Sequence, residues 1–519
     1  MTTSSKFALS SGLVAALLLS GCASLVPQPL TPDEITATSA ADREQMQRAV
    51  EPLQGALTLE EAMARAVKYN LERRTRVLEQ ALAQGQLDVG RYEQLPKLMA
   101  NAGYRHRDEE LITRSRNAVN GRLSESDPFI STARTAWATD LTFTWSLLDF
   151  GQSYYATRQN ADRVLIAAER KRKALHILLQ DVRTAFWRTA SAQKLRGEVR
   201  ATLAAASAAL ADSRKAEAER LRNPVDALRY QRQLLENVRL LEAIEQELST
   251  ARIELAALVN LPLARNLSVV EPAQMPDRRW LELPVDKMEE LAIARNADLR
   301  EAFYNTRIAA DETRRALLRQ FPGLSFSYGP HYSTDDYLIN DHWREAGLQL
   351  SFNLLGLLSA PAQKRLAETG EAVALQRRMA TQMAVLTQLH LARQQYANAL
   401  AQLERADTIW KVDTDLASHA TRREQAQTQT KLEQVAAQTA AILSQLRRYQ
   451  ALSQAQAAAG RLQASLGMEP ELEAPDVPLA QLTQSVSASL RQWDEAQVTD
   501  LLGATPPAPA RAEAAPAVR

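Results

Sequence analysis

Two stretches of the chain alternate between apolar and polar residues at every second position, which is the pattern of a β-strand with one apolar face. The apolar positions of the two stripes are, in chain order, Leu141, Phe143, Trp145 and Leu147, then Leu348, Leu350, Phe352 and Leu354. A shorter alternating run precedes each stripe and follows a proline, Pro96 or Pro322, which ends any helix before it. The pattern predicts two β-hairpins, at 96–148 and 322–355.

Strands with one apolar and one polar face suit a membrane β-barrel with a wet interior, and they equally suit a half-buried strand pair in a soluble domain. Aromatic side chains gather where a membrane meets water, and several lie near the predicted strand ends. They are Trp137, Trp145, Tyr332 and Trp343. Two hairpins are too few to close a barrel, which needs about eight strands. A chain that spans the membrane in this way must therefore oligomerise.

Long helices follow each hairpin, over 152–262 and 361–468. No proline interrupts Gln152–Leu221, and about 70 residues at about 1.5 Å each give roughly 100 Å of helix. Asn223-Pro224 then predicts a reversal of the chain. The return helix has the apolar spacing of a coiled coil, at Leu234, Val238, Leu241, Leu248, Leu255 and Val259. Such helices could form a coiled-coil rod or the wall of a hollow barrel.

The same order of elements occurs twice along the chain. Asn70 and Asn296 are as far apart in the sequence as Pro96 and Pro322, the prolines that precede the two hairpins. Similar residues also recur at matching positions of the strands and of the long helices. Because a constant spacing is the sign of an internal repeat, we interpret the chain as a duplicated unit, at 57–262 and 283–470.

Shorter segments surround these two units. A helix opens the first unit, where Thr58 and Glu61 have the spacing of a capping box. The segments 263–282 and 471–502 each follow a return helix and mix prolines with short apolar runs, so we expect them to form an equatorial belt around the helices. Residues 503–519 are rich in proline and alanine and predict a disordered tail.

Residues 1–21 have the features of a secretory signal peptide, a positive residue followed by a short apolar run and small residues. Cys22, the single cysteine, comes directly after Leu19-Ser20-Gly21, an order that resembles the lipobox of bacterial lipoproteins. That resemblance implies a lipidated Cys22 and, without an aspartate after it, delivery to the outer membrane. The alternative is a chance cysteine after an ordinary cleavage site. Residues 22–56 are expected to form an extended segment.

Composition and charge exclude several function classes. The chain has 62 Lys and Arg against 61 Asp and Glu, a formal net charge of +1, which gives no electrostatic basis for binding nucleic acid. Its 6 histidines are scattered, and His331 and His342 in the second hairpin do not make a recognisable metal motif. The sequence contains no nucleotide-binding loop and no nucleophile motif. We therefore expect no enzyme activity, cofactor or metal.

The doubled order of helix, hairpin, long helix and return helix resembles the TolC-type family of outer-membrane efflux and secretion channels, over residues 57–470. The most specific residues are Leu57-Thr58-Leu59-Glu60-Glu61-Ala62, Leu95-Pro96, Leu147-Leu148-Asp149-Phe150-Gly151, Pro224-Val225-Asp226-Ala227-Leu228, Leu261-Pro262 and Leu466-Gly467. The resemblance implies a mainly α fold with a small membrane β-barrel, in which three chains together form a twelve-stranded β-barrel on a twelve-helix α-barrel.

The resemblance also implies a function. It indicates a passive exit duct of a tripartite efflux pump or a type I secretion system, lipid-anchored in the outer membrane with a large periplasmic portion. The implied partners are two further copies of the chain, a periplasmic adaptor of the membrane-fusion type, an inner-membrane transporter and outer-membrane lipid. A different class remains open, a periplasmic coiled-coil adaptor or structural lipoprotein without a membrane span.

The same resemblance suggests site residues at the helix tips. It places a periplasmic gate at Glu433, with Asp226 as the matching residue of the first copy, and three such carboxylates around an axis would favour cations. The alternative is a pair of ordinary solvated carboxylates. Candidate adaptor-docking residues are Arg220, Arg222, Asn223, Arg422, Arg423 and Thr430, with a solvated charged tip as the alternative. Arg220 and Gln427 stand where the family commonly has glycine, and Ala436 replaces a second acidic residue found in some members.

Overall fold

The computed structural model describes residues 27–114, 116, 118–123, 128–219, 224–263, 267–271, 278–426, 430–468 and 476–490. The predicted signal peptide, Cys22, the tip residues Arg220, Arg222 and Asn223, and the tail 503–519 lie outside these described residues. The chain divides into two compact units, Met1–Pro52 and Leu53–Arg519, which are taken separately below.

The first unit corrects one expectation, because residues 22–56 are not extended throughout. They contain the helix α2 (Pro32–Arg48), which begins at a capping box. The hydroxyl of Thr31 accepts a hydrogen bond from the Glu34 N–H at 3.3 Å, and the Thr31 N–H donates to the Glu34 carboxylate at 2.8 Å. This backbone hydrogen bond from Thr31 is the main reason why the pKa of Glu34 lies below its usual value. A proline at the first helical position adds to the local preference for helix.

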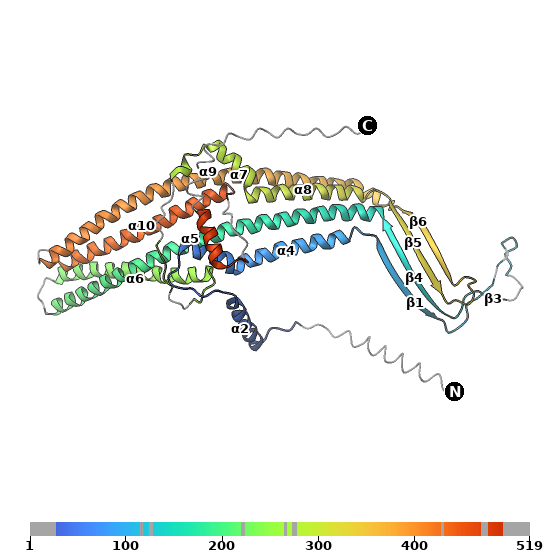
Figure 1. The fold of residues 1–519 in the computed structure, drawn as a ribbon, viewed down its shortest axis with the longest axis horizontal. Helices are drawn as coiled ribbons and strands as arrows, with labels where there is room; N and C mark the ends of the chain where they lie inside the picture. Colours follow the sequence, from blue (N-terminus) through green and yellow to red (C-terminus); the bar gives the residue numbers. More distant parts are fainter. Residues whose placement is uncertain are drawn as a thin grey trace, which may run out of the picture. The chain divides into compact units, whose positions relative to one another are not determined.

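In the second unit, the two predicted hairpins join into one antiparallel sheet (Figure 1). Its strands, in spatial order, are β1 (Lys97–His106), β4 (Thr135–Ser146), β5 (Gly323–Ser333) and β6 (His342–Ser351). A small ribbon, β2 (Ile112–Thr113) with β3 (Phe129–Ile130), lies in the loop of the first hairpin. The two hairpins thus pair through β4 and β5. The strands β1 and β6 form the two edges of the sheet.

Both predicted apolar stripes extend beyond the observed strands. Leu147 is the first residue of helix α5, because the Ser146 hydroxyl accepts a hydrogen bond from the Asp149 N–H at 3.2 Å and begins the helix there. Phe352 and Leu354 follow the end of β6, in a turn closed by Asn353. The hairpins are therefore shorter at this end than 96–148 and 322–355.

A pair of short helices precedes each hairpin. These are α3 (Leu59–Tyr69) with α4 (Leu71–Tyr92), and α7 (Val285–Arg295) with α8 (Ala297–Leu318). Asn70 and Asn296 separate the members of each pair, with extended ψ angles of 127° and 130°, and each side chain caps the helix that follows. The single helix expected before each hairpin is thus two helices. The repeated lengths, 11 and 22 residues in both copies, match the internal repeat.

Four long helices make up most of this unit. They are α5 (Leu147–Ala218), α6 (Pro224–Leu258), α9 (Gly356–Gln425) and α10 (Lys431–Ser465). In the predicted coiled-coil stripe of the first return helix, Leu234, Leu241, Leu255 and Val259 are completely buried, and Val238 is half-buried. The return helices have the same length, 35 residues each.

The helices of the second unit are arranged in a wall one helix thick. Next to the sheet, the helices lie side by side in the order α4, α5, α8, α9. The strands connected to them, β1, β4, β5 and β6, lie in the same order in the sheet. In the half away from the sheet the order is α6, α5, α10, α9. Figure 1 shows α5 and α9 running through both halves. Apolar clusters join the helices, for example Leu195, Leu241 and Leu446 from α5, α6 and α10.

Segments predicted to form a belt contact the middle of this wall, as far as the structure describes them. Leu57 pairs with Val269 in a short parallel bridge, and the Gln193 side chain donates to the Val269 carbonyl at 3.1 Å. The Tyr449 hydroxyl donates to Glu271 at 3.1 Å, and burial raises the pKa of Tyr449 to about 12. Lys68 donates to the Val477 carbonyl at 2.9 Å. Among the described residues, no helix combines the length and apolarity needed to cross a membrane.

Candidate functional site

The register of the sheet brings its apolar side chains to one face. Leu98 pairs with Phe143, Phe143 with Tyr328, and Tyr328 with Ala346, so residues of matching parity line up across all four strands. Side chains on this face are exposed, and the large ones are Leu98, Tyr104, Trp137, Leu141, Phe143, Trp145, Leu324, Phe326, Tyr328, Tyr332, Leu348 and Leu350. A monomeric soluble protein rarely leaves so many adjacent apolar side chains in water. This face is therefore suited to contact an apolar phase or another protein.

The opposite face of the sheet is polar. On it, Asp140 accepts hydrogen bonds from Asn101 and from Thr142, both at 2.9 Å. Trp343 also lies on this face, where its ring stacks on His331 at a centroid distance of 5.4 Å. The expectation that Trp343 is an interfacial aromatic is thus wrong, because its parity along β6 is opposite to that of Leu348 and Leu350.

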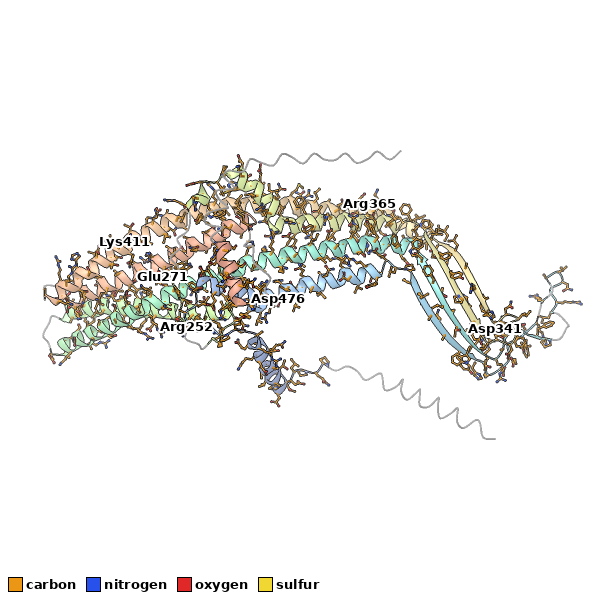
Figure 2. The ribbon with its side chains drawn as sticks, viewed as in Figure 1. Arg252, Glu271, Asp341, Arg365, Lys411 and Asp476 are labelled. Atoms are coloured by element: carbon orange, nitrogen blue, oxygen red, sulfur yellow. The ribbon has the colours of Figure 1, made fainter. Side chains whose placement is uncertain are left out.

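The turns of the two hairpins are tied together at the end of the sheet away from the helices. The buried Asp335 accepts a hydrogen bond from Arg105 at 2.9 Å and another from the backbone N–H of Ala133 at 2.9 Å. The bond from Ala133 is the main reason why the pKa of Asp335 lies below its usual value. Asp341, at the last turn before β6, marks this end of the sheet (Figure 2).

Two edges of the second unit end without a neighbour in the described part of the chain. β1 and β6 are each 10 residues long, and each is paired along one side only. An exposed edge of this length presents a row of unpaired N–H and C=O groups that favours pairing with another strand. The helical wall is open at the same two sides. Its outermost helices are α4 and α6 on one side and α9 on the other. Both the sheet and the helical wall are thus open at the same two sides of the unit.

Ion pairs join the two repeats where α5 lies against α8. Arg158 contacts Asp311 at 3.3 Å, and Arg170 contacts Glu301 at 2.7 Å. The other pairs in this row are Asp162 with Arg307, Glu169 with Arg300 and Lys173 with Asp298. The carboxylates of Asp162, Glu169 and Asp311 are buried. The row was not predicted, because pairing between distant helices cannot be read from either helix alone.

The predicted gate residue Glu433 has a local structural role. It is the third residue of α10 and forms a capping box with Thr430, whose hydroxyl accepts from the Glu433 N–H at 3.4 Å while the Thr430 N–H donates to the Glu433 carboxylate at 3.0 Å. Its side chain is nevertheless exposed, as is that of Asp226, which lies 3.9 Å from Arg229. The threonine and glutamate three residues apart were a sequence signal for this cap.

Arg422, another described tip residue, and Lys431, next to Thr430, have partners nearby in the chain. Arg422 donates to the Ser418 carbonyl at 3.3 Å, and Lys431 contacts Glu424 at 3.3 Å across the turn between α9 and α10. His342 lies 2.6 Å from Asp341 and His331 lies 3.9 Å from Glu345, but no group of three or more His, Cys, Asp or Glu side chains in the described ranges could hold a metal ion.

Comparisons with known proteins agree with this architecture. A membrane protein from Pseudomonas aeruginosa matches at 17% identity and a TM-score of 0.61, over 79% of this chain and 90% of that one. The CmeC outer membrane channel of Campylobacter jejuni matches at 10% identity and a TM-score of 0.63, over 84% of this chain and 89% of that one. The open-state MtrE outer membrane channel of Neisseria gonorrhoeae matches at 15% identity and a TM-score of 0.59, over 79% and 89%.

This chain has the TolC-type channel fold. The predicted fold class, long coiled helices with strand hairpins, is confirmed. No protein-family model matches the sequence, and no curated protein is significantly similar to it. The TolC-type fold is therefore visible in the three-dimensional arrangement and not in overall sequence similarity.

Proposed function

We propose that the chain forms a homotrimeric outer-membrane channel that acts as the passive exit duct of a tripartite efflux pump or a type I secretion system. The observation that carries this proposal is the pair of open edges on a one-layer wall whose fold is that of outer membrane channels. Three copies would supply twelve strands, which exceeds the roughly eight needed for a closed barrel. Pairing of β1 with β6 of a neighbouring copy removes both edges at once.

In this assembly the two faces of the sheet have different surroundings. The apolar face contacts lipid, and the polar face with Asp140 and His331 lines a water-filled passage. Lipidation of Cys22 adds a second attachment, since acyl chains contribute about 0.8 kcal/mol per buried methylene group. In a periplasmic adaptor or structural lipoprotein without a membrane span, so large an apolar face would be exposed to water. We therefore favour the channel.

Cysteine pairs across the proposed contact test the assembly. With Asn101→Cys on β1 and either Glu345→Cys or Gln349→Cys on β6, oxidation of membranes should give covalent dimers and trimers on non-reducing gels. All these side chains belong to the polar face of an edge strand. The matched control combines Asn101→Cys with Ser327→Cys on the central strand β5, and it should stay monomeric. A purified mature protein that is monomeric and needs no detergent would refute the channel.

The partners follow from the duct. We propose that the helix tips, with Arg422, Arg423 and Thr430 and with the sequence-predicted tip residues Arg220, Arg222 and Asn223, meet a periplasmic adaptor, which connects them to an inner-membrane transporter. Deletion of the gene should then sensitise cells to dyes, detergents or metals, or block export of a protein. Unchanged tolerance together with normal secretion would contradict this role.

Two substitutions at Glu433 separate a gate charge from a helix cap. Glu433→Gln removes the charge and keeps an oxygen that can accept from the Thr430 N–H, whereas Glu433→Ala removes both. If three Glu433 carboxylates form an anionic ring, both variants should weaken the block of single-channel conductance by divalent cations several-fold. Only Glu433→Ala should also lower thermal stability, by about 1 kcal/mol per chain.

Asp415→Asn is the matched control for the gate, because Asp415 is an exposed carboxylate on α9 that takes no part in the turn or its cap. It should leave cation block unchanged. Normal block in Glu433→Gln would assign Glu433 to capping alone.

A further inference from the structure

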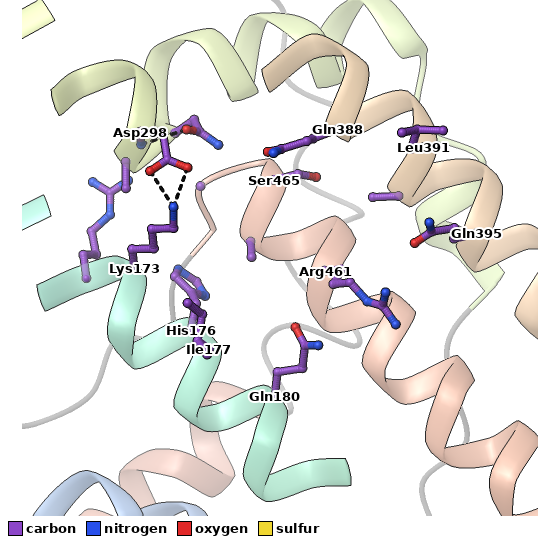
Figure 3. Close-up of a pocket in the computed structure, with 16 residues that line it drawn as sticks. Lys173, His176, Ile177, Gln180, Asp298, Gln388, Leu391, Gln395, Arg461 and Ser465 are labelled. Carbon is purple, nitrogen blue, oxygen red and sulfur yellow. Dashed lines mark hydrogen bonds and ion pairs between the residues drawn. The ribbon is translucent and has the colours of Figure 1, made fainter. Parts of the chain in front are cut away.

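A cavity of about 310 Å³ lies in the middle of the helical wall, where α5 crosses from α8 to α10. Figure 3 shows Lys173, His176 and Gln180 on α5 around this space, with Arg461 on α10 and Gln388 on α9. The cavity is built within a single chain. It does not depend on the trimer or on any channel activity.

The wall of the cavity combines two kinds of surface. Its apolar part consists of side chains from α5, α9 and α10, namely Ile177, Leu391, Ala392 and Ala464. Most of the remaining lining side chains carry amide, hydroxyl or charged groups. Binding pockets for small molecules have this composition, mostly apolar with a few placed polar groups, and volumes from about 300 Å³ upward.

The charges that line the cavity do not balance. Lys173 contacts Asp298 at 2.8 Å, and Arg172 contacts Glu169 at 2.8 Å, so these cations already have carboxylate partners. Arg461 is exposed, and within the described part of the chain it has no carboxylate within ion-pair distance. The Arg461 Nε donates a long hydrogen bond, at 3.5 Å, to the Ala457 carbonyl of the same helix.

The other ionisable groups around the cavity do not change this balance. Burial, with Arg172 and Arg183 nearby, lowers the pKa of His176 to about 4, so the imidazole is neutral at physiological pH. Asp298 is occupied by Lys173. Asn296 uses its side-chain oxygen to cap α8. One guanidinium therefore remains beside an apolar surface, with no anion to match it.

We propose that this cavity binds a small amphiphile with a single anionic head group, whose head meets the guanidinium of Arg461 and whose apolar tail contacts Ile177 and Leu391. An inorganic anion would leave the apolar wall in contact with water. A cationic amphiphile would place its head among three positive side chains and find one carboxylate, already paired. A medium-chain carboxylate or alkyl sulfate satisfies both surfaces.

A fluorescent fatty acid tests the binding in the full-length protein, purified and reconstituted in nanodiscs of zwitterionic lipid. Dansyl-undecanoic acid should show saturable binding with a rise in emission, and decanoate should displace it. Decyltrimethylammonium, with a similar tail and the opposite charge, and butyrate, with the same head and a short tail, should not. Equal displacement by decyltrimethylammonium would overturn the proposal.

Matched arginine variants locate the head group. Arg461→Gln should weaken the binding roughly tenfold or more, the usual effect of removing a hydrogen bond to a charged group. Arg447→Gln changes the same residue type at another exposed position of α10, outside the cavity, and should bind like the unmodified protein. Unchanged affinity in Arg461→Gln would show that the cavity does not select the anion.

Photo-crosslinking on the unmodified protein gives an independent readout that no folding defect can obscure. A diazirine-labelled decanoate should attach to α5 or α9 near Ile177 or Leu391, as identified by mass spectrometry of the peptides. Attachment confined to the apolar face of the sheet would mean simple adsorption to the lipid-contacting surface and would refute the cavity site. Either result stands whether or not the chain proves to be a channel.

Discussion

Replacing Gly329 with alanine is expected to remove most of the proposed trimer from the outer membrane. Gly329 lies in the central strand β5, and a Cβ atom there would come within 2.3 Å of the Leu141 carbonyl oxygen on β4. That distance is far inside van der Waals contact with backbone atoms that cannot rotate away. The strands must separate or shift, at a cost of about 3 kcal/mol per chain or more.

The close approach has a cause in the sequence. The pairing of β4 with β5 is interrupted between Asp140–His331 and Phe143–Tyr328, at Gly329 and Pro330, and a proline has no N–H to donate to a ladder. The two backbones converge at this interruption, and only a residue without a side chain fits. Glycine in a strand interior often marks such a site.

Gly103→Ala is the matched control for this prediction. Gly103 lies on the edge strand β1 and on the same polar face, but a Cβ added there would meet nothing within 4 Å. The amount of heat-resistant oligomer in membrane fractions and its melting temperature measure both variants. Gly103→Ala should match the unmodified protein, and equal effects of the two substitutions would contradict the steric explanation.

The features predicted from the sequence are those determined by local patterns. Period-two alternation located the strands, Pro96 and Pro322 limited the helices before them, and the spacing of Leu234 and Leu241 identified the buried stripe. Each of these signals depends on neighbouring residues and on the period of a helix or strand. The repeat strengthened them, because each pattern occurred twice.

Some local signals were present and were not used. Asn70 and Asn296 are both preceded by a helix and followed by another, and asparagine is a strong helix cap, so the break could have been predicted. Thr430 and Glu433 have capping-box spacing, but resemblance alone assigned Glu433 to a gate. Trp343 could have been placed on the polar face by its parity with Leu348.

Contacts between distant segments had no such local signal. The row of ion pairs between α5 and α8 depends on which helices become neighbours and on their axial register. Arg158 and Asp311, for example, are far apart in the sequence. The cavity near Arg461 arises for the same reason, since its wall comes from α5, α8, α9 and α10. Sequence patterns place residues on the face of a helix, and packing decides what they meet.

Asp311→Asn should loosen the junction between the two repeats. Asp311 is only 1% exposed and lies between Arg158 at 3.3 Å and Arg314 at 2.7 Å. The amide cannot balance two guanidinium groups, and both arginines lose their counter-charge. Because each arginine is about half exposed, water offsets part of the loss. We expect a decrease in stability of about 2 kcal/mol per chain, below the range of fully buried pairs.

Asp88→Asn provides the comparison that makes this expectation specific. Asp88 on α4 contacts Arg91 at 3.2 Å, but both side chains are at least half exposed, so its loss should change stability by less than about 0.5 kcal/mol. Thermal melting at fixed protein concentration would measure both variants, and hydrogen exchange would locate the effect. In Asp311→Asn, α8 should exchange faster while α6 and α10 keep their protection, because apolar contacts such as Leu241 with Leu446 hold that half of the wall. Equal losses in the two variants would show that the buried row does not hold the repeats together.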